Sequence, residues 1–380
     1  MTKVSFWTVA DLVTQTAAPS GFKVSLEDIV PGVGTLVSGP LSQYSADGTP
    51  FERGYVLFGK LRPYLAKYWL ADREGVAGGD IHVYRPQEGV DPRYLAYIVG
   101  SRDFVRYAVA ASKGVKMPRV EWMSLRQYAV NMYDKRTQGA IADYLDRETG
   151  EIDAMLAKLE VLNEALNIRR ASVIERETIT RSGRLTRLKF CANLSLGKTL
   201  QGARKSDRET LVNYVRAASI QPHGLELDDQ RMWMTQEELQ KYDLRLGDIL
   251  IVEGGAAGRS VYLEKDIPGW GFQNHVIRVR PDERHDGRFL NYCIKGHYAG
   301  GVIDILADGA TIPGLSSDKA KNLPIPDMSL DEQQRIADHL DEVTGRIDAM
   351  LTKIDEFKAI LAERRAALIS DVVTGRKKVA

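Results

Sequence analysis

The chain has 380 residues, of which 44% are hydrophobic and 27% charged, with a formal net charge of +1. This composition suits a soluble globular protein of two or three domains, and no apolar run approaches the roughly 18 residues of a membrane span, so we expect a cytoplasmic protein outside the membrane. Two cysteines, Cys191 and Cys293, and six histidines offer neither a disulfide framework nor a zinc-ligand spacing.

Residues 1–137 are predicted to form a first globular domain of mixed strands and loops. Short strand-like runs at 55–58 and 81–84 alternate with turns that contain glycine and proline. One helix is predicted from Pro92 to about Val109, because proline at a first helical turn leads into apolar residues at helical spacing.

A first long helix is predicted over residues 138–183, ending near Arg181-Ser182-Gly183. Its apolar residues recur in alternating steps of four and three, which is a heptad seam that needs a partner helix. The distance from Ile141 to Val173 is roughly 50 Å of helix. The main seam residues of this copy are Ile141, Leu145, Ile152, Leu159 and Leu166, with Glu148, Met155, Leu162 and Arg169 at the alternate positions.

Residues 184–330 are predicted to form a second domain with a related plan. Arg85-Pro86 is echoed by Arg280-Pro281, and residues 54–57 and 116–120 are echoed by 247–250 and 311–315. A second long helix is predicted over 331–376, followed by a basic tail at 377–380.

The two long helices are near copies of each other. Gln138–Ile174 aligns with Gln333–Ile369 without a gap at a constant offset of 195, and 13 of the 19 residues from Gln138 to Leu156 are identical. Two unrelated helices are disfavoured, because a duplicated unit implies a duplicated structural role. We therefore expect an α+β protein whose two helices pair as an antiparallel coiled coil. The second copy supplies the seam residues Ile336, Leu340, Ile347, Ile354 and Leu361, with Val343, Met350, Phe357 and Arg364 at the alternate positions.

The tandem plan and three stretches resemble one known family. These are residues 60–67 (KLRPYLAK), 246–250 (LGDIL), and the approach to the second helix, with Pro326, Glu332-Gln333 and Ile336-Ala337. The chain resembles the specificity (S) subunit of a type I restriction–modification system. The first copy departs slightly, with Thr137-Gln138 in place of Glu332-Gln333.

The resemblance implies two α/β target-recognition domains joined by the two helices. Each domain would read one half of a bipartite, asymmetric sequence in double-stranded DNA. The family's S subunit has no chemistry of its own. The implied partners are methylation subunits, expected to number two, and restriction subunits. S-adenosylmethionine is expected in the methylation subunit, with no cofactor in this chain.

Two glycine-containing stretches bear on enzymatic alternatives. Residues 196–199 (LGKT) resemble the end of a phosphate-binding loop, but alanine occupies position 192, where that loop needs glycine. Residues 253–259 (EGGAAGR) lack the spacing of a dinucleotide-binding turn and read as a hairpin or as a turn that approaches DNA. No catalytic or metal-binding residues are predicted. The alternatives to DNA recognition are a coiled-coil adaptor whose variable domains bind proteins and a self-contained methyltransferase.

Basic and aromatic residues interleave in two stretches of the first domain. Such cations suit contacts to phosphate and guanine, whereas the plain alternative is a surface strand with solvated cations. The predicted DNA-binding residues of this domain are Lys60, Arg62, Tyr64, Lys67, Lys113, Lys116 and Arg119.

The second domain offers weaker individual candidates. Gln201 and Asn274 could read adenine and Arg259 guanine, while Lys198 could contact a phosphate and His275 could equally lie in the interior. The predicted DNA-binding residues are Lys198, Gln201, Arg204, Lys205, Arg216, Arg259, Asn274 and His275.

The arginines at the alternate seam positions need acidic partners, because an unpaired buried cation costs several kcal/mol. In an antiparallel pair the numbers of facing residues have a constant total, and placing Glu148 opposite Arg364 sets that total at 512. The same register places Arg169 beside Glu342. We predict that these two ion pairs set the register of the coiled coil.

Overall fold

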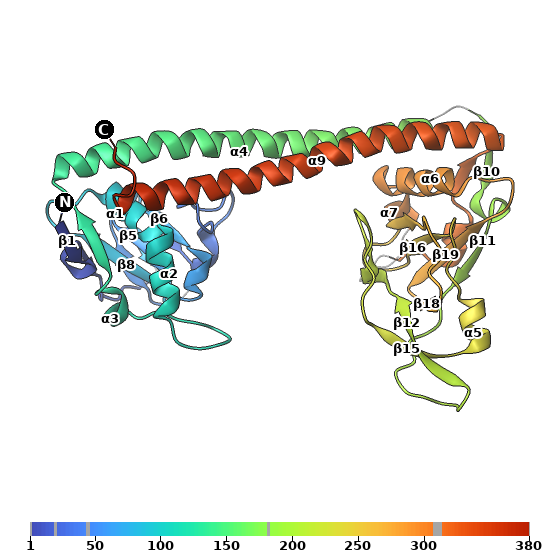
Figure 1. Ribbon diagram of the computed structural model, residues 1–380, viewed down its shortest axis with the longest axis horizontal. Helices are drawn as coiled ribbons and strands as arrows, with labels where there is room; N and C mark the ends of the chain where they lie inside the picture. The colour runs from blue at the N-terminus through green and yellow to red at the C-terminus, as the bar shows by residue number, and fades with distance from the viewer. Residues whose placement is uncertain (1, 19–20, 43–45, 181–182, 307–313, 380) are drawn as a thin grey trace. The chain divides into compact units, whose positions relative to one another are not determined.

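The computed structural model describes residues 2–18, 21–42, 46–180, 183–306 and 314–379. The chain divides into two compact units, unit 1 (Met1–Glu160 and Ile354–Ala380) and unit 2 (Val161–Lys353). Each long helix contributes one end to each unit (Figure 1). The predicted domain boundaries at 137, 183, 330 and 376 stay predictions.

Unit 1 is built on a four-stranded antiparallel sheet of order β2-β8-β5-β6. Its strands are β2 (Ala10–Leu12), β8 (Ile81–Pro86), β5 (Val56–Gly59) and β6 (Tyr68–Leu70). The central strands β5 and β8 are almost entirely buried, as their apolar runs predict, because both faces of the sheet are covered.

Smaller elements surround this sheet. A three-stranded sheet and a two-stranded sheet consist of β3 (Lys23–Val24), β7 (Gly75–Ala77) and β4 (Thr49–Phe51), and of β1 (Thr2–Ser5) and β9 (Ala129–Met132). The helices are α1 (Pro92–Gly100), α2 (Arg102–Ala110) and α3 (Trp122–Leu125).

The single helix predicted from Pro92 to Val109 is instead two helices. The break falls at Ser101, whose backbone is extended and whose Oγ accepts from the amide of Phe104, so that it caps α2. Gly100, at the end of α1, allows the ring of Tyr68 to pack closely, because a Cβ there would lie 2.3 Å from that ring. The two-helix break therefore follows from a serine cap beside a crowded glycine.

Unit 2 repeats the main sheet with the order β11-β19-β16-β17. Its strands are β11 (Ala192–Leu196), β19 (Val276–Pro281), β16 (Ile249–Val252) and β17 (Ser260–Tyr262), all antiparallel. The helix α6 (Gly287–Ala299) packs on this sheet and contributes buried residues to its core. Figure 1 shows α6 between the sheet and the long helices of this unit.

The rest of unit 2 lies around and beyond this sheet. Figure 1 shows β12 and β15 on the side of the unit away from the long helices. The remaining elements are β10 (Leu185–Arg187), β12 (Glu209–Val215), β13 (Ile220–Gln221), β14 (Gly224–Leu225), β15 (Arg231–Thr235), β18 (Trp270–Phe272), β20 (Pro324–Pro326), α5 (Gln236–Lys241), α7 (Val302–Leu306) and α8 (Ser317–Lys321).

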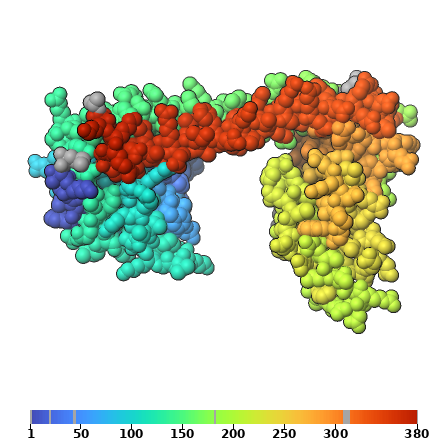
Figure 2. Space-filling model, viewed as in Figure 1, coloured from blue at the N-terminus to red at the C-terminus, as the bar shows by residue number. Residues whose placement is uncertain are grey.

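The two long helices are α4 (Lys135–Thr178) and α9 (Leu330–Val373). Asp134 begins α4 by accepting hydrogen bonds from the amide and hydroxyl of Thr137. The predicted end near Arg181-Ser182-Gly183 lies partly outside the described residues, which omit 181 and 182. Within unit 1, α9 lies along the surface beside α4 (Figure 2).

The ten main seam residues are all buried or half-buried in their units. The alternate positions, however, fall one residue later than predicted. Thr149 and Thr344 are buried, whereas Met155 and Met350 are 45% and 52% exposed. Each threonine hydroxyl donates to the carbonyl four residues earlier at 2.7 Å, so its burial leaves no polar group unsatisfied.

This shift makes the predicted pair between Arg364 and Glu148 wrong. Arg364 is exposed, and Glu148 pairs with the adjacent Arg147. The buried cation is Arg365, whose guanidinium donates to Asp153 on α4 at 2.9 Å. The two helices are antiparallel in unit 1, and facing residues total 518 instead of 512.

The second predicted pair, between Arg169 and Glu342, is wrong for the same reason. Arg169 is exposed and Glu342 pairs with Arg346 one turn away on its own helix. In unit 2 it is Arg170 that faces Asp348, at 3.5 Å. Arg170 and Asp348 are the counterparts of Arg365 and Asp153 at the offset of 195, and their numbers also total 518.

Each domain also attaches to the start of its own following helix. In unit 1 the side chain of Gln138 accepts from the amide of Asp91, which caps α1. Arg93 reaches Asp146 on α4 at 2.7 Å, and the hydroxyl of Tyr97 donates to the same carboxylate at 2.7 Å.

Unit 2 repeats this attachment residue by residue. Gln333 accepts from the amide of Asp286, which caps α6. Arg288 reaches Asp341 on α9 at 2.8 Å, and Tyr292 donates to that carboxylate at 2.7 Å. The repeated helix residues therefore serve to hold each domain as well as to pair the helices.

We predict that Arg365→Ala lowers the free energy of unfolding by about 2–4 kcal/mol, whereas the adjacent Arg364→Ala changes it by less than about 0.5 kcal/mol. Arg365 also donates to the carbonyls of Gly32 and Val33, so its removal leaves three acceptors without a donor. Urea unfolding followed by circular dichroism measures both values. Equal effects of the two substitutions would contradict the assignment.

Candidate nucleic-acid interface

The two basic stretches predicted in the first domain lie side by side. The amide of Arg62 donates to the carbonyl of Pro118 at 2.7 Å, and the amide of Val120 donates to Lys60 at 3.0 Å. About fifty residues of sequence thus separate segments that form one surface. We call Lys60, Arg62, Lys113, Lys116 and Arg119 the basic surface of unit 1.

A hairpin over residues 113–119 projects from this surface. Lys113 and Arg119 close it with reciprocal backbone hydrogen bonds of 2.9 Å each. The loop follows α2 and extends away from the long helices of unit 1 (Figure 1). Its tip exposes two apolar side chains, Val115 fully and Met117 by 56%. The search for charged residues in the sequence missed these two exposed apolar side chains, although they flank Lys116, which it found.

A short turn presents the aromatic residue of the other stretch. Pro63–Leu65 forms a single 3₁₀ turn between Arg62 and Ala66, which have φ of 51° and 50°. These are the only non-glycine residues with positive φ in the described part of the chain. Such a backbone costs of order 1–3 kcal/mol per residue and is typical of functional sites. It leaves Tyr64 54% exposed beside the cations.

Most cations of the basic surface are available to a ligand. Arg62, Lys113 and Lys116 are exposed and form no ion pair with another described residue. Arg119 is also exposed but pairs with Asp80 at 2.6 Å. Lys60 is half-buried.

Lys67 differs from the prediction. Its ammonium donates to the carbonyl of Leu26 at 2.7 Å and bridges two segments of the domain. A lysine that satisfies a backbone carbonyl is part of the fold, so we remove Lys67 from the candidate contacts.

A buried histidine lies beneath the basic surface. His82 on β8 is 5% exposed, and its Nδ1 lies 3.1 Å from the hydroxyl of Tyr84. Burial, and then the positive charges of Lys60 and Arg119, lower the pKa of His82 to about 3. The ring is therefore neutral at physiological pH.

Lys198 in the second domain does not fit the predicted phosphate contact. It is 8% exposed, and its ammonium is paired with Glu238, a member of the capping box of α5. The preceding Gly197 is packed so closely that a Cβ would lie 2.2 Å from the carbonyl oxygen of Phe272. The Leu-Gly-Lys-Thr stretch thus packs against the backbone at Phe272, and its lysine is paired with a carboxylate, which argues against a phosphate-binding loop.

Gln201 and Lys205 belong to a loop that a carboxylate organises. Glu209 accepts from the Gln201 side chain at 2.8 Å and from the amides of Lys205 and Ser206. These hydrogen bonds lower the pKa of Glu209. The side chain of Gln201 is therefore engaged, whereas the ammonium of Lys205 is exposed and has no ion-pair partner among the described residues.

Arg204 and Arg216 are held by neighbouring groups. Arg204 is exposed, stacks 5.8 Å from the centre of the Trp233 ring and lies 3.3 Å from Asp207. Arg216 pairs with Asp228 at 2.6 Å. Both guanidiniums would have to exchange these partners to contact DNA.

The remaining three candidates lie in and beside the glycine-rich turn. Arg259 is half-buried and donates to the carbonyl of Ile220 at 3.4 Å. Asn274 is half-buried, with its amide bound to the carbonyl of Lys198. The His275 side chain is 58% exposed beside Glu253, so the interior alternative is wrong.

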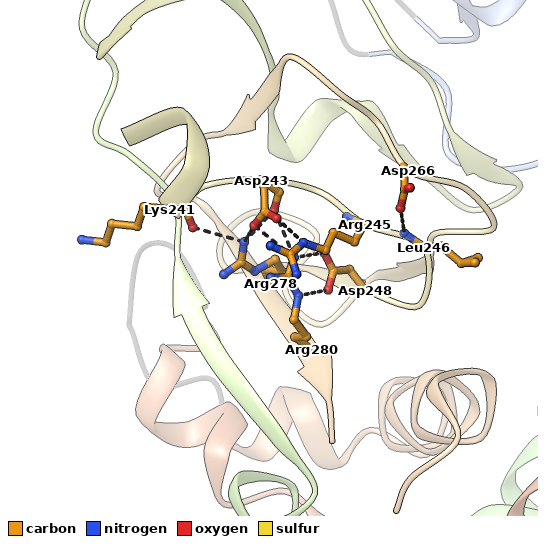
Figure 3. Close-up of polar contacts among 8 residues, drawn as sticks. All are labelled: Lys241, Asp243, Arg245, Leu246, Asp248, Asp266, Arg278 and Arg280. Atoms are coloured by element: carbon orange, nitrogen blue, oxygen red, sulfur yellow. Dashed lines mark hydrogen bonds and ion pairs between the residues drawn. The ribbon is translucent and has the colours of Figure 1, made fainter. Parts of the chain in front are cut away.

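The Leu-Gly-Asp-Ile-Leu stretch is a structural feature of unit 2 (Figure 3). Asp248, 1% exposed, accepts two hydrogen bonds of 2.7 Å from Arg280. Arg278 and Arg280 share Asp243, at 2.9 and 3.1 Å. Burial alone would raise the pKa of Asp243, but Arg245 and Arg280 hold it below its ordinary value. The guanidinium groups of Arg278 and Arg280 are thus held by carboxylates of the fold and are not free to contact DNA.

Two further searches cover the described residues alone. None of them gather three or more histidine, cysteine, aspartate or glutamate side chains in a way that could hold a metal ion. In the same part of the chain, no helix combines the length and hydropathy of a membrane-crossing segment.

Residues 205–359 match the family model of the type I restriction modification DNA specificity domain. The type I restriction enzyme StySPI specificity subunit of Salmonella potsdam is 26% identical over 227 residues, a match covering 55% of this chain and 48% of that protein. The EcoBI specificity subunit of Escherichia coli is 28% identical over 100 residues, which cover 26% of this chain and 20% of that protein. The matched part of this chain thus spans about half the length of the Salmonella protein and about a fifth of the Escherichia coli protein.

Solved structures share the fold at low sequence identity. A chain from work on complex assembly and conformational transition of the type I R-M system aligns with a TM-score of 0.75 at 16% identity, covering 98% of this chain and 97% of that one. The HsdS subunit from Thermoanaerobacter tengcongensis aligns with a TM-score of 0.54 at 16% identity, covering 99% and 97%. The tandem plan of two domains and two long helices is therefore the fold of these proteins.

We predict that Lys60→Met and Arg119→Met each raise the pKa of His82, which nevertheless stays below the ordinary value of about 6.5 because burial is the larger cause. Since the folded pKa is lowered, the stability that His82 contributes is complete above about pH 6.5 and is lost as the pH falls towards the folded value. An NMR titration of the His82 ring measures the shift, with Lys3→Met as the exposed control. An unchanged pKa in both variants would contradict the electrostatic account.

Proposed function

We propose that this chain is a specificity subunit of a type I restriction–modification system and that it recognises double-stranded DNA for such a complex. The observation that carries the proposal is the basic surface of unit 1, where two distant segments bring exposed cations around Tyr64 and the apolar hairpin tip. An adaptor for protein partners would be favoured by an acidic face at Arg62 and Lys116, and the exposed charged groups there that form no ion pair with a described residue are basic.

The recognition mechanism divides between two kinds of contact. Exposed lysines such as Lys113 and Lys116 neutralise phosphates and fix the position of the domain on the duplex. Arg62, held by its strained backbone, has the fork geometry that binds the O6 and N7 acceptors of guanine. In the second domain, Lys205 and the exposed His275 are the candidates least engaged by the fold.

The proposed role is recognition alone. Methylation subunits, two in number, would bring S-adenosylmethionine and the methyl transfer, and restriction subunits would bring cleavage. The chain would act in the cytoplasm, where the DNA is. Each domain would read one half of a bipartite target, and because the two domains differ in sequence, the two halves would differ.

We predict that Arg62→Ala and Lys116→Ala each weaken DNA binding by the reconstituted complex. Lys116→Ala also lowers the slope of log affinity against log salt by about one unit because a phosphate contact is lost, whereas Arg62→Ala removes a guanine contact and relaxes the base preference at that position. Fluorescence anisotropy with a duplex containing the target, at several salt concentrations, measures this. Lys3→Ala should leave the slope unchanged, and melting temperatures should match the wild type because both side chains are exposed. Reduced binding with a large fall in melting temperature would point to a structural role.

We predict that exchanging residues 1–137 for those of a relative changes only one half of the methylated target. The reason is that each domain attaches to its own helix through the same repeated residues, so the second domain keeps its position. Methylome sequencing of cells with the exchanged and the original gene reads both halves at once. A change in both halves would refute one-domain, one-half-site recognition.

A further inference from the structure

Two apolar side chains stand at the tip of the hairpin of residues 113–119 in unit 1. Val115 is fully exposed and Met117 is 56% exposed, one on either side of Lys116. A single exposed apolar residue is common on protein surfaces, but two at the tip of a projecting loop form a small apolar surface among cations. The fold gains no burial from Val115, because its side chain is covered by no other residue.

Backbone hydrogen bonds hold the base of this hairpin. Lys113 and Arg119 close it with two hydrogen bonds of 2.9 Å each. Next to them, the carbonyl of Pro118 accepts from the amide of Arg62 at 2.7 Å, which attaches the hairpin to the neighbouring basic stretch. Gly114 starts the turn at a φ of 98°, where a Cβ would lie 3.2 Å from a carbonyl oxygen across the loop. A ligand therefore meets a tip whose base is fixed, so little conformational entropy is lost on binding.

The shape and the charge of the hairpin match the major groove of B-form DNA. This groove is about 12 Å wide and admits a two-stranded ribbon, whereas an undistorted minor groove of about 6 Å is too narrow. Lys113 and Lys116 are exposed and form no ion pair with a described residue, so their ammonium groups are available to the phosphates at the edges of the groove. Val115 stands between these two lysines in the sequence and is directed to the base edges when they contact phosphates.

The major groove presents one methyl group, the 5-methyl group of thymine. The other groups by which the base pairs are distinguished there are hydrogen-bond donors and acceptors. An aliphatic side chain satisfies none of these polar groups, and covering one of them without a partner costs free energy. A valine that meets the base edges therefore favours thymine over the other bases.

We propose that Val115 covers the 5-methyl group of a thymine in the half-site that unit 1 reads, so that the hairpin tip recognises this base through an apolar contact. Met117, whose side chain is long and flexible, adds a second apolar surface beside it. Lys113 and Lys116 position the tip by contacting phosphates. This inference rests on the proposed recognition of DNA and adds to it a base and the residue that reads it.

Two other roles of the tip lead to different results. An apolar side chain that wedges between two bases unstacks them, and this does not depend on a methyl group. A contact of the tip with a protein partner would also be independent of the base. Removal of the methyl group alone therefore separates the proposed role from both.

The test replaces thymine by uracil, which has the same hydrogen-bonding groups and lacks the 5-methyl group. The reconstituted complex is titrated with the duplex that methylome sequencing identifies as its target, and with copies in which each thymine in turn is replaced by uracil. Fluorescence anisotropy should show a loss of affinity of about fourfold at one position, as expected for one buried methyl group. That position should lie in the half-site that the exchange of residues 1–137 assigns to unit 1.

Val115→Ser is the decisive variant, because it replaces the two methyl groups of valine by one hydroxyl. It should bind the thymine duplex about fourfold more weakly and should bind the thymine and uracil duplexes equally at that position. The slope of log affinity against log salt should equal that of the wild type, since no charge is removed, in contrast to Lys116→Ala. The melting temperature should be unchanged because the side chain is exposed.

Two matched controls accompany this variant. Val115→Ile keeps an apolar, β-branched side chain and should keep the loss of affinity on uracil substitution. Val37→Ser changes another exposed valine of unit 1, four residues after Val33, whose carbonyl accepts from Arg365 on α9. It should leave the affinities for both duplexes unchanged.

Several outcomes would overturn the proposal. A loss on uracil substitution that persists in Val115→Ser would assign the methyl group to another residue. Specific binding with no loss on any uracil substitution, or a half-site of unit 1 without thymine, would also reject it while leaving DNA recognition intact. Failure of the complex to prefer its target over an unrelated duplex would remove the proposed function, and this inference with it.

Discussion

The arginine–aspartate pair between the two long helices, whose arginine is buried in unit 1 and half-buried in unit 2, is the interaction on which the rest of each unit depends. A seam of leucine and isoleucine tolerates several registers, because one aliphatic residue can replace another at the interface. Arg365 restricts the helices of unit 1 to one register. A buried guanidinium without a partner costs several kcal/mol, and Asp153 lies opposite Arg365 only in that register. In unit 2 the counterpart pair, Arg170 and Asp348, sets the same total of residue numbers. The sequence repeat thus contains both the apolar seam and the arginine–aspartate pair that sets its register.

A second repeated constraint fixes each domain to the helix that follows it. Gln138 and Gln333 each bind the amide of the aspartate that caps a domain helix, so the start of the long helix and the cap of the shorter one are tied together. Tyr97 and Tyr292 each add a hydroxyl that donates to an aspartate about two turns further along the long helix. In unit 1 these contacts join α1 to α4, whereas the hairpin of residues 113–119 follows α2 and extends away from the long helices (Figure 1). The loops can therefore change without disturbing the frame that carries them.

The sequence predicts the frame better than the site, for physical reasons. Helical repeats and buried strands leave periodic apolar patterns, whereas the fate of a single cation depends on neighbours that lie far away in sequence. Lys67 and Lys198 look like solvated lysines in the sequence, yet one satisfies the carbonyl of Leu26 and the other a carboxylate of α5. The predicted seam was wrong by one residue at these positions. The hydroxyl of Thr149 donates to the carbonyl of Leu145 four residues earlier, so this polar residue is buried next to the position where an apolar residue was expected. That single step exchanged Arg364 for its identical neighbour.

The two domains share an order of strands but hold it together differently, and this bears on how they can diverge. In unit 2, Arg280 on β19 is bound by the buried Asp248, which joins two strands of the main sheet. In unit 1 the counterpart Arg85 pairs with a half-buried aspartate, Asp11, and the position of Asp248 is taken by Tyr55. The two domains thus differ in the ion pair of this arginine, Arg280 with Asp248 in unit 2 and Arg85 with Asp11 in unit 1, but they make the same contacts to the long helices. The contacts that repeat between the two units therefore lie at the domain–helix junctions, whereas the surfaces that would touch DNA differ in sequence between the units.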